Sequence, residues 1–257
     1  MAKVYHLDLD KKSIRGARIV LLPGDPERSG LIADEIAKVY GGRAERLASK
    51  REFFTHVARC DGLNVLVTST GIGGPSASIA VDELARLGVR TFIRVGTTGA
   101  IQKDIKAGDV VITTGAVRLD GASTHYAPLE YPAVADFTVV NALIAGARKA
   151  GIKWHAGVTA SSDTFYPGEE RGDSFRNYVI KRLQGSAAEW RNLHVLNYEM
   201  ESATILTMTA SMGLMGGCIT GVVNRAGGRA ISEKNLRLGE RNAVMAAVRA
   251  LGDLTGR

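Results

Sequence analysis

The chain lacks the residues that would indicate a disulfide-stapled protein, a zinc site or a serine hydrolase. Only 2 of its 257 residues are cysteines, Cys60 and Cys218, which is too few for a disulfide framework and not a metal-binding spacing. Its 5 histidines are scattered without a His-Glu-x-x-His pair, and no Gly-x-Ser-x-Gly elbow occurs. Because two isolated thiols are typical of a reducing compartment, we expect a cytoplasmic location.

Long apolar runs and dense basic runs are also absent. No stretch approaches the roughly 18 apolar residues of a membrane helix, and charges interrupt the first residues too often for a signal peptide. The formal net charge is +7, from 33 Lys and Arg against 26 Asp and Glu, but the basic residues lie singly along the chain. This distribution predicts a small anionic ligand, with no nucleic-acid or membrane partner.

The chain does contain an alternation of strand-like and helix-like segments. Short β-branched runs occupy 17–22, 64–70, 91–96, 109–115, 155–161 and 217–223. Between them, apolar residues recur at helical spacing over 73–88, 135–151, 199–213 and 232–251. Several runs are apolar on both faces, as strands covered by helices on both sides are. The pattern predicts an α/β fold with a central mixed, twisted β-sheet flanked by α-helices, as a single domain over residues 1–257.

The loops after these strands carry the candidate chemistry, since ligands of open α/β sheets bind beyond the carboxyl ends of the strands. In PGDPER (23–28), Gly24 permits close backbone approach and Arg28 lies in the first turn of a helix. That arrangement fits either an anion cradle or a plain turn. In GIGGPSAS (71–78), Ser76 stands in place of the third glycine of a dinucleotide fingerprint, so we do not expect a dinucleotide.

Two further loops hold charged side chains at strand ends. Arg94 in RVGTTGA (94–100) lies within an apolar strand and needs an anionic partner, either a carboxylate or a ligand, while Thr97 offers donors beyond it. In NYEMESA (197–203), Glu199 and Glu201 flank Met200 where a strand passes into a helix. Such carboxylates either accept hydrogen bonds from a vicinal diol, as on a ribose, or serve only the helix dipole.

Taken in order along the chain, these loops resemble one family. The motifs are LPGDPER, SKREF, STGIGGPS, RVGTTGAI, SSDTFYPG, NYEMESAT and VVNR. Through them the chain resembles the nucleoside phosphorylase superfamily over essentially its whole length, and within it the uridine phosphorylases. The resemblance implies reversible phosphorolysis of uridine to uracil and ribose 1-phosphate, with inorganic phosphate as co-substrate and no organic cofactor. It also implies a homohexamer, built as a trimer of dimers with sites shared across the dimer interface.

The resemblance assigns roles by position. The phosphate site comprises Gly24, Arg28, Arg94 and Thr97, with Arg51 reaching in from the neighbouring subunit. The ribose site comprises Met200 and Glu201, with Glu199 nearby and His6 from the neighbouring subunit. The base site comprises Phe165, Glu169, Arg171 and Arg225. The catalytic set is Arg94, Thr97, Arg171 and Glu201. A potassium site found at the dimer interface of some relatives matches Glu52, Ile72 and Ser76.

One residue departs from the family pattern. Uridine phosphorylases typically have glutamine where FYPGEER (165–171) has Glu169, and an ionised carboxylate cannot donate a hydrogen bond to a uracil oxygen. Glu169 is therefore neutralised by Arg171 or Arg225 or by a raised pKa, or it points away from the base, or the base is not uracil. The last alternative is a guanosine or inosine phosphorylase, since guanine presents two adjacent donors. A non-catalytic nucleoside-binding protein is the alternative from another class.

Overall fold

A mixed β-sheet of ten strands organises the computed structural model, which describes residues 3–227 and 231–255. Its strands are β1 (Ile19–Leu22), β2 (Glu45–Lys50), β3 (Phe53–Cys60), β4 (Leu63–Thr68), β5 (Thr91–Ala100), β6 (Val110–Leu119), β7 (Ala133–Val134), β8 (Trp154–Ser162), β9 (Asn197–Glu199) and β10 (Met215–Arg225). The α-helices are α1 (Pro26–Tyr40), α2 (Gly74–Leu87), α3 (Phe137–Lys149), α4 (Ser186–Asn192), α5 (Ser202–Ser211) and α6 (Glu233–Thr255). Short 3₁₀ turns are η1 (Ala122–His125) and η2 (Lys181–Leu183).

The strand order is β10-β6-β8-β9-β5-β1-β4-β3-β2, and β10 also pairs with β5. Strands β5, β10, β6, β8 and β9 therefore close into a ring, from which β1, β4, β3 and β2 extend as an open arm. Parallel pairs such as β1–β5 and β5–β10 mix with antiparallel pairs such as β3–β4 and β5–β9. The predicted α/β fold with a central mixed sheet is confirmed, whereas the ring closure was not predicted. The single-domain description of residues 1–257 stays a prediction.

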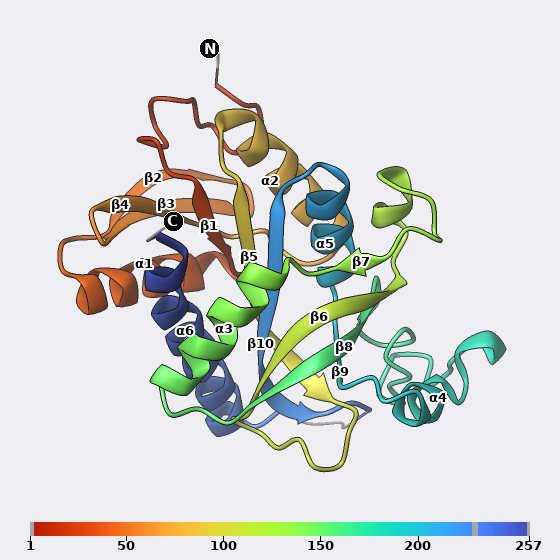
Figure 1. The fold of residues 1–257 in the computed structure, drawn as a ribbon. Coiled ribbons are helices and arrows are strands. Elements are labelled where there is room, and N and C mark those ends of the chain that lie inside the picture. The colour runs from red at the N-terminus through yellow and green to blue at the C-terminus, as the bar shows by residue number, and fades with distance from the viewer. Residues whose placement is uncertain (1–2, 228–230, 256–257) are drawn as a thin grey trace.

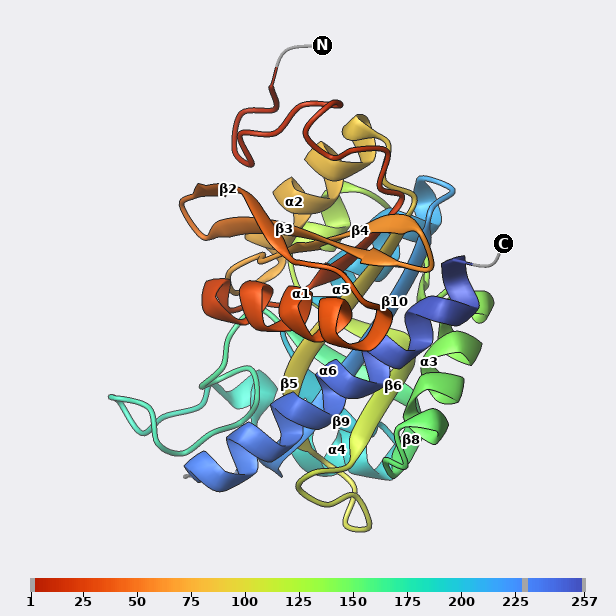
Figure 2. The same cartoon turned by 90° about the vertical axis from the view of Figure 1, so that its left-hand side faces the viewer.

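Two apolar cores cover the two faces of the sheet. Strand β1 alternates between them, because Ile19 and Leu21 join one core while Val20 and Leu22 join the other. Helices α1, α3 and α6 pack on the first core, and α2 and α5 on the second. Figure 1 shows α3 and α6 side by side, and Figure 2 shows α1 and α6 in front of the strands. This layering leaves the loops at the strand ends free to form a site.

Local hydrogen bonds fix where the helices begin. The side chain of Asp25 accepts a hydrogen bond from the backbone N–H of Glu27 at the start of α1, and that of Asp136 accepts from the N–H groups of Thr138 and Val139 at the start of α3. Predicted helices over 73–88, 135–151 and 232–251 are confirmed within a few residues by α2, α3 and α6. Across the described ranges, no helix has both the length and the apolar character of a membrane span.

Candidate active site

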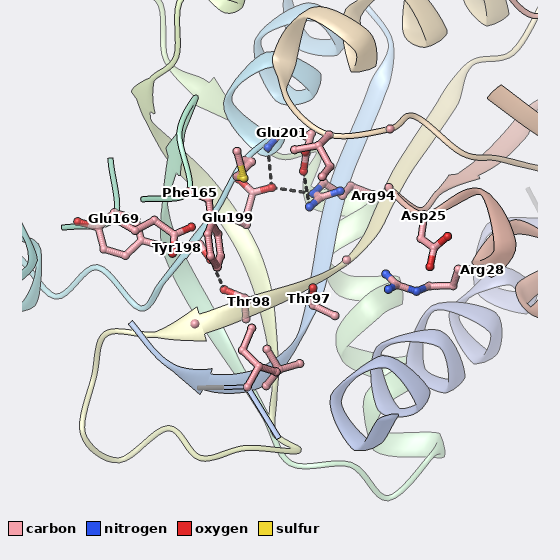
Figure 3. Close-up of a pocket in the computed structure, with 18 of the residues that line it drawn as sticks. Asp25, Arg28, Arg94, Thr97, Thr98, Phe165, Glu169, Tyr198, Glu199 and Glu201 are labelled. Atoms are coloured by element: carbon pink, nitrogen blue, oxygen red, sulfur yellow. Dashed lines mark hydrogen bonds and ion pairs between the residues drawn. The ribbon is translucent and has the colours of Figure 1, made fainter. Parts of the chain in front are cut away.

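A cavity of about 730 Å³ opens where the carboxyl ends of several strands meet. Its walls come from the β1–α1, β4–α2 and β9–α5 junctions, the ends of β5 and β10, and the loop that follows β8. In Figure 3, Arg28 lies at one end, Phe165 and Glu169 at the other, and Arg94 and Glu201 between them. A cavity at this edge is the place where an α/β sheet binds its ligand.

Arg94 at the centre of the cavity is bound by two glutamates. Its Nε donates to Oε2 of Glu199 at 2.7 Å, and its Nη2 forms an ion pair with Oε2 of Glu201. Side chains of all three are almost fully buried, at 7% exposure for Arg94, 0% for Glu199 and 3% for Glu201. The guanidinium folds over Gly96, where a Cβ would lie 2.8 Å from Nη2. The predicted need of Arg94 for an anionic partner is thus met by carboxylates, while its Nη1 has no hydrogen-bond partner among the described residues.

The strand-to-helix junction holds the two carboxylates in different ways. Glu199 accepts hydrogen bonds from the backbone N–H groups of Glu201 at 2.9 Å and Ser202 at 3.0 Å, and Glu201 accepts from the N–H of Gly73 at 2.5 Å. Burial raises the pKa of Glu199, but Arg94 and the hydrogen bonds outweigh it, so this pKa is lowered. Burial raises the pKa of Glu201 more than Arg94 lowers it, and Glu199 raises it further. Glu199 is therefore the more firmly ionised of the two.

A second cationic group of the cavity is Arg28, in the first turn of α1. Its Nη2 forms an ion pair with Glu240 of α6, a partner 212 residues away in the sequence. The preceding loop lies against the β4–α2 loop, where the N–H of Gly71 donates to the carbonyl of Gly24 at 2.9 Å. A Cβ on Gly24 would approach the carbonyl oxygen of Gly71 to 3.2 Å, so this close packing favours glycine. Thr97, on β5, also lines the cavity and lies beside Thr98 in Figure 3.

The opposite end of the cavity is formed by the loop after β8. Phe165 and Glu169 line it, and Glu169 is only 4% exposed. The pKa of Glu169 is raised to about 8, because burial and, to a smaller extent, Glu199 and Glu201 raise it more than Arg171 lowers it. This shift favours the protonated form of Glu169 at neutral pH. The three alternatives given for this residue in the sequence analysis stay predictions.

Comparison with known proteins places the chain among enzymes that cleave nucleosides. The model of the phosphorylase superfamily matches residues 18–252. The chain is 54% identical to the uridine phosphorylase of Klebsiella aerogenes and 53% identical to that of Escherichia coli (strain K12), over 96% of this chain and of each relative. It is 37% identical to the guanosine phosphorylase of Halorubrum lacusprofundi, over 85% of this chain and 82% of that protein. The chain belongs to the phosphorylase superfamily, in the uridine phosphorylase family.

Several residues that the family resemblance singles out lie outside the cavity wall of this chain. The guanidinium of Arg171 lies 4.3 Å from the ring centroid of Phe165 and makes two hydrogen bonds to Asp173, at 3.1 and 2.7 Å. Nη2 of Arg225 donates to the carbonyl of Lys103 at 2.7 Å, and its neighbour Asn224 lines the cavity instead. Neighbouring residues of a strand point to opposite faces, so only one of the pair can face the site.

Two residues predicted to act in a neighbouring subunit's site also lie away from the cavity. Arg51 is exposed in the turn between β2 and β3, with φ of 55°. His6 is partly buried, and its Nδ1 lies 2.8 Å from Oε1 of Glu83. Neither lines the cavity of its own chain in the described structure, a placement compatible with the predicted sharing of sites between subunits.

The predicted potassium ligands lie together at the cavity. Glu52, Ile72 and Ser76 all line it, with Oγ of Ser76 donating to Oε1 of Glu52 at 2.7 Å, and Ile72 is 78% exposed. Carboxylate, hydroxyl and carbonyl oxygens suit a hard cation. Within the described ranges, no group of three or more His, Cys, Asp or Glu side chains could hold a metal ion.

Sequence reasoning missed three lining or supporting residues. Glu240 gave no signal, because its contact with Arg28 joins opposite ends of the chain. Asn224 and Tyr198 were given no role in the sequence analysis, although both line the cavity. The alternation of side chains along β10 could have separated Asn224 from Arg225.

Proposed function

We propose that the chain catalyses the reversible phosphorolysis of uridine to uracil and ribose 1-phosphate. The observation that carries this proposal is the order of groups along one cavity: a cationic end at Arg28, a buried arginine with two glutamates in the middle, and an aromatic ring with a protonated acid at the far end. Phosphate, ribose and base follow the same order in the reacting complex. The identity to uridine phosphorylases, at 53–54%, supports uridine over a purine nucleoside.

Each group has a role that its chemistry suits. Gly24, Arg28, Arg94 and Thr97 hold phosphate, Met200 and Glu201 with Glu199 hold the ribose, and Phe165 and Glu169 contact the base, with Arg171 behind Phe165. A phosphate oxygen attacks the anomeric carbon, the bond from that carbon to the base nitrogen breaks, and the bonding electrons leave with the base. Positive charge builds on the sugar, and the phosphate beneath it stabilises that charge. Arg171 opposes the negative charge on the departing base.

Arg94 must change partners during this cycle. In the free enzyme its guanidinium is bound to Glu199 and Glu201, but its buried Nη1 remains available to an anion. A phosphate that binds Nη1 and competes for Nη2 loosens the ion pair to Glu201. Glu201 can then accept hydrogen bonds from the ribose hydroxyls.

The proposal extends to assembly and surroundings. Arg51 and His6 reach the site of a neighbouring subunit within a homohexamer, and Glu52, Ile72 and Ser76 form half of a potassium site completed by a second copy. Light scattering tests the hexamer, and a rise in Tm with KCl that choline chloride does not reproduce tests the cation site. The free buried thiols of Cys60 and Cys218 support a reducing, cytoplasmic location. Cleavage of uridine to a free base and a sugar phosphate suits a role in nucleoside salvage.

A substrate panel tests the central reaction. Uridine, thymidine, inosine and guanosine are incubated at pH 6 with phosphate, arsenate or neither, and released base is quantified. We expect uridine to be cleaved fastest, and only when phosphate or arsenate is present. Guanosine as the preferred substrate would reverse the base assignment. Binding of uridine without any turnover would identify a nucleoside-binding protein instead of an enzyme.

A further inference from the structure

Hydrogen bonds within the loop after β8 fix the position of Glu169. Its neighbour Glu170 adopts φ of 52° and turns away, so that its carboxylate accepts hydrogen bonds from the N–H groups of Gly185 and Ala187 (the latter at 2.9 Å) at the start of α4. The N–H of Gly168 donates to Thr164 at 2.9 Å and anchors the preceding turn. The two glutamates of FYPGEER therefore diverge, one capping a helix and the other facing the cavity.

Arg28, Arg94 and Arg171 each form an ion pair with a carboxylate other than Glu169. Arg94 is bound to Glu199 and Glu201, and Arg28 to Glu240, while Arg171 makes two hydrogen bonds to Asp173. Among the described residues, no hydrogen bond to the Glu169 carboxyl group is found. An ionised Glu169 would be a third buried carboxylate beside Glu199 and Glu201, and among the described residues Arg171 is the cation whose attraction would offset its charge.

Burial and two neighbouring carboxylates favour the neutral form of Glu169, and Arg171 favours the ionised form. Glu199 and Glu201, at the β9–α5 junction, raise its pKa after burial has done so, and Arg171 on its own loop opposes them without prevailing. Tyr198, on β9, has a pKa raised to about 12 by burial and stays neutral over the same range. Glu170 is turned to α4.

We propose that Glu169 binds the nucleobase as a neutral carboxylic acid, donating a hydrogen bond from one oxygen and accepting one with the other. This inference rests on the proposed phosphorolysis of uridine. A neutral acid pairs with an edge that presents a carbonyl next to an N–H, which is the edge of an imide such as uracil. An ionised carboxylate only accepts, so it pairs instead with two adjacent donors, such as the N–H and amino group of guanine. The protonation state of Glu169 therefore sets which class of base is recognised.

The experiment compares the pH dependence of kcat/KM for uridine in the wild type, Glu169→Gln and Glu170→Gln, from pH 5.5 to pH 9.5. Glutamine keeps one donor and one acceptor but does not titrate. The ratio of wild type to E169Q cancels the ionisation of phosphate and of uracil itself, which both enzymes share. We expect this ratio to fall about tenfold per pH unit above pH 8, mainly through KM. E170Q, the adjacent substitution, should keep the wild-type profile.

Two results would overturn the proposal in distinguishable ways. A ratio that stays constant over the whole range, in enzymes that cleave uridine, would show that Glu169 does not act as an acid toward the base, and would leave the proposed function standing. Failure of the wild type to cleave uridine even at pH 6 would remove the proposed function and this inference with it. A rise in guanosine cleavage by the wild type above pH 8, absent from E169Q, would support the inference further.

Discussion

Removing the charge of Arg94 tests the buried network at the centre of the cavity. Arg94→Met keeps most of the side-chain volume but leaves Glu199 and Glu201 buried, at 0% and 3% exposure, without their guanidinium partner. Removing one member of a buried ion pair costs about 3–5 kcal/mol, since the remaining charges are left uncompensated. A chain of this size loses roughly 2–4 °C in Tm per kcal/mol, so we expect Tm at pH 8 to fall by about 10 °C.

The size of this effect depends on pH with a definite sign. In the wild type the folded-state pKa of Glu199 is lowered, so its contribution to stability is present above the unfolded pKa and is lost as pH falls through the folded pKa. Without Arg94, the hydrogen bonds to both carboxylates remain, but the cation is gone and burial is the largest remaining influence. We therefore expect both pKa values to rise above those of the unfolded chain. The variant then binds more protons folded than unfolded, and its stability falls as pH rises. The difference in Tm between the two proteins should therefore be smaller at pH 5.5 than at pH 8.

Thermal unfolding at pH 5.5 and pH 8, without phosphate, measures the effect. Arg18→Met, at an exposed position just before β1, is the matched control and should change Tm by no more than about 2 °C. An R94M protein that matches this control, or that loses the same Tm at both pH values, would show that the two glutamates do not depend on Arg94. The same variant should need far more phosphate for turnover, and unchanged phosphate kinetics would remove Arg94 from the phosphate site.

Three other substitutions follow from local geometry. Because the pKa of Glu169 is raised on folding, the free energy of unfolding of the wild type should fall as pH rises from 5 to 8. The free energy of unfolding of E169Q relative to the wild type should therefore increase by about 3 kcal/mol over this range. A constant difference in urea midpoint between the two proteins at all pH values would contradict this. Gly221→Ala would place a Cβ 1.9 Å from the carbonyl oxygen of Gly239, so calorimetry should show a loss of about 1–3 kcal/mol or more, whereas Gly121→Ala meets only an ordinary contact and should not. Asp136→Ala should cost about 1 kcal/mol in chemical denaturation by removing the cap of α3, and D136N should restore most of it.

The loops of the site could be predicted because short-range patterns determine them. A β-branched run followed by glycine and then an amphipathic segment predicts a strand end facing a helix start, and this placed Glu199 and Glu201 correctly at the junction of β9 and α5. The same logic placed Arg94 in a buried strand with an anionic partner. The same patterns did not predict the hairpin of β2 and β3. The residues of the edge strand β2 are charged or partly exposed, so the strand shows no alternation of buried and exposed side chains.

The pairing of distant segments could not be predicted in the same way. The ring of strands depends on β10 pairing with both β5 and β6, which no local pattern encodes. Similarly, Glu240 lies on a long helix whose polar face carries several charges, and only the folded structure brings it to Arg28. Local motifs identify which side chains enter a site, but tertiary pairing decides which charges they meet there.

Glu169 shows why this distinction matters for function. From the sequence, FYPGEER contains a carboxyl group at Glu169, but its protonation state, the direction of its side chain and the base that it contacts do not follow. Three features of the fold determine its protonation and orientation. The backbone turn directs Glu170 to α4, and Asp173 binds the nearby guanidinium of Arg171. Glu199 and Glu201, about thirty positions later in the sequence, add negative charge beside it. Replacing an amide by an acid at this position preserves the donor-and-acceptor pattern only because burial and neighbouring negative charge keep the acid protonated. Base recognition is then a property of the whole cavity, and any change that brings a free cation near Glu169 should alter the preferred base without touching the motif itself.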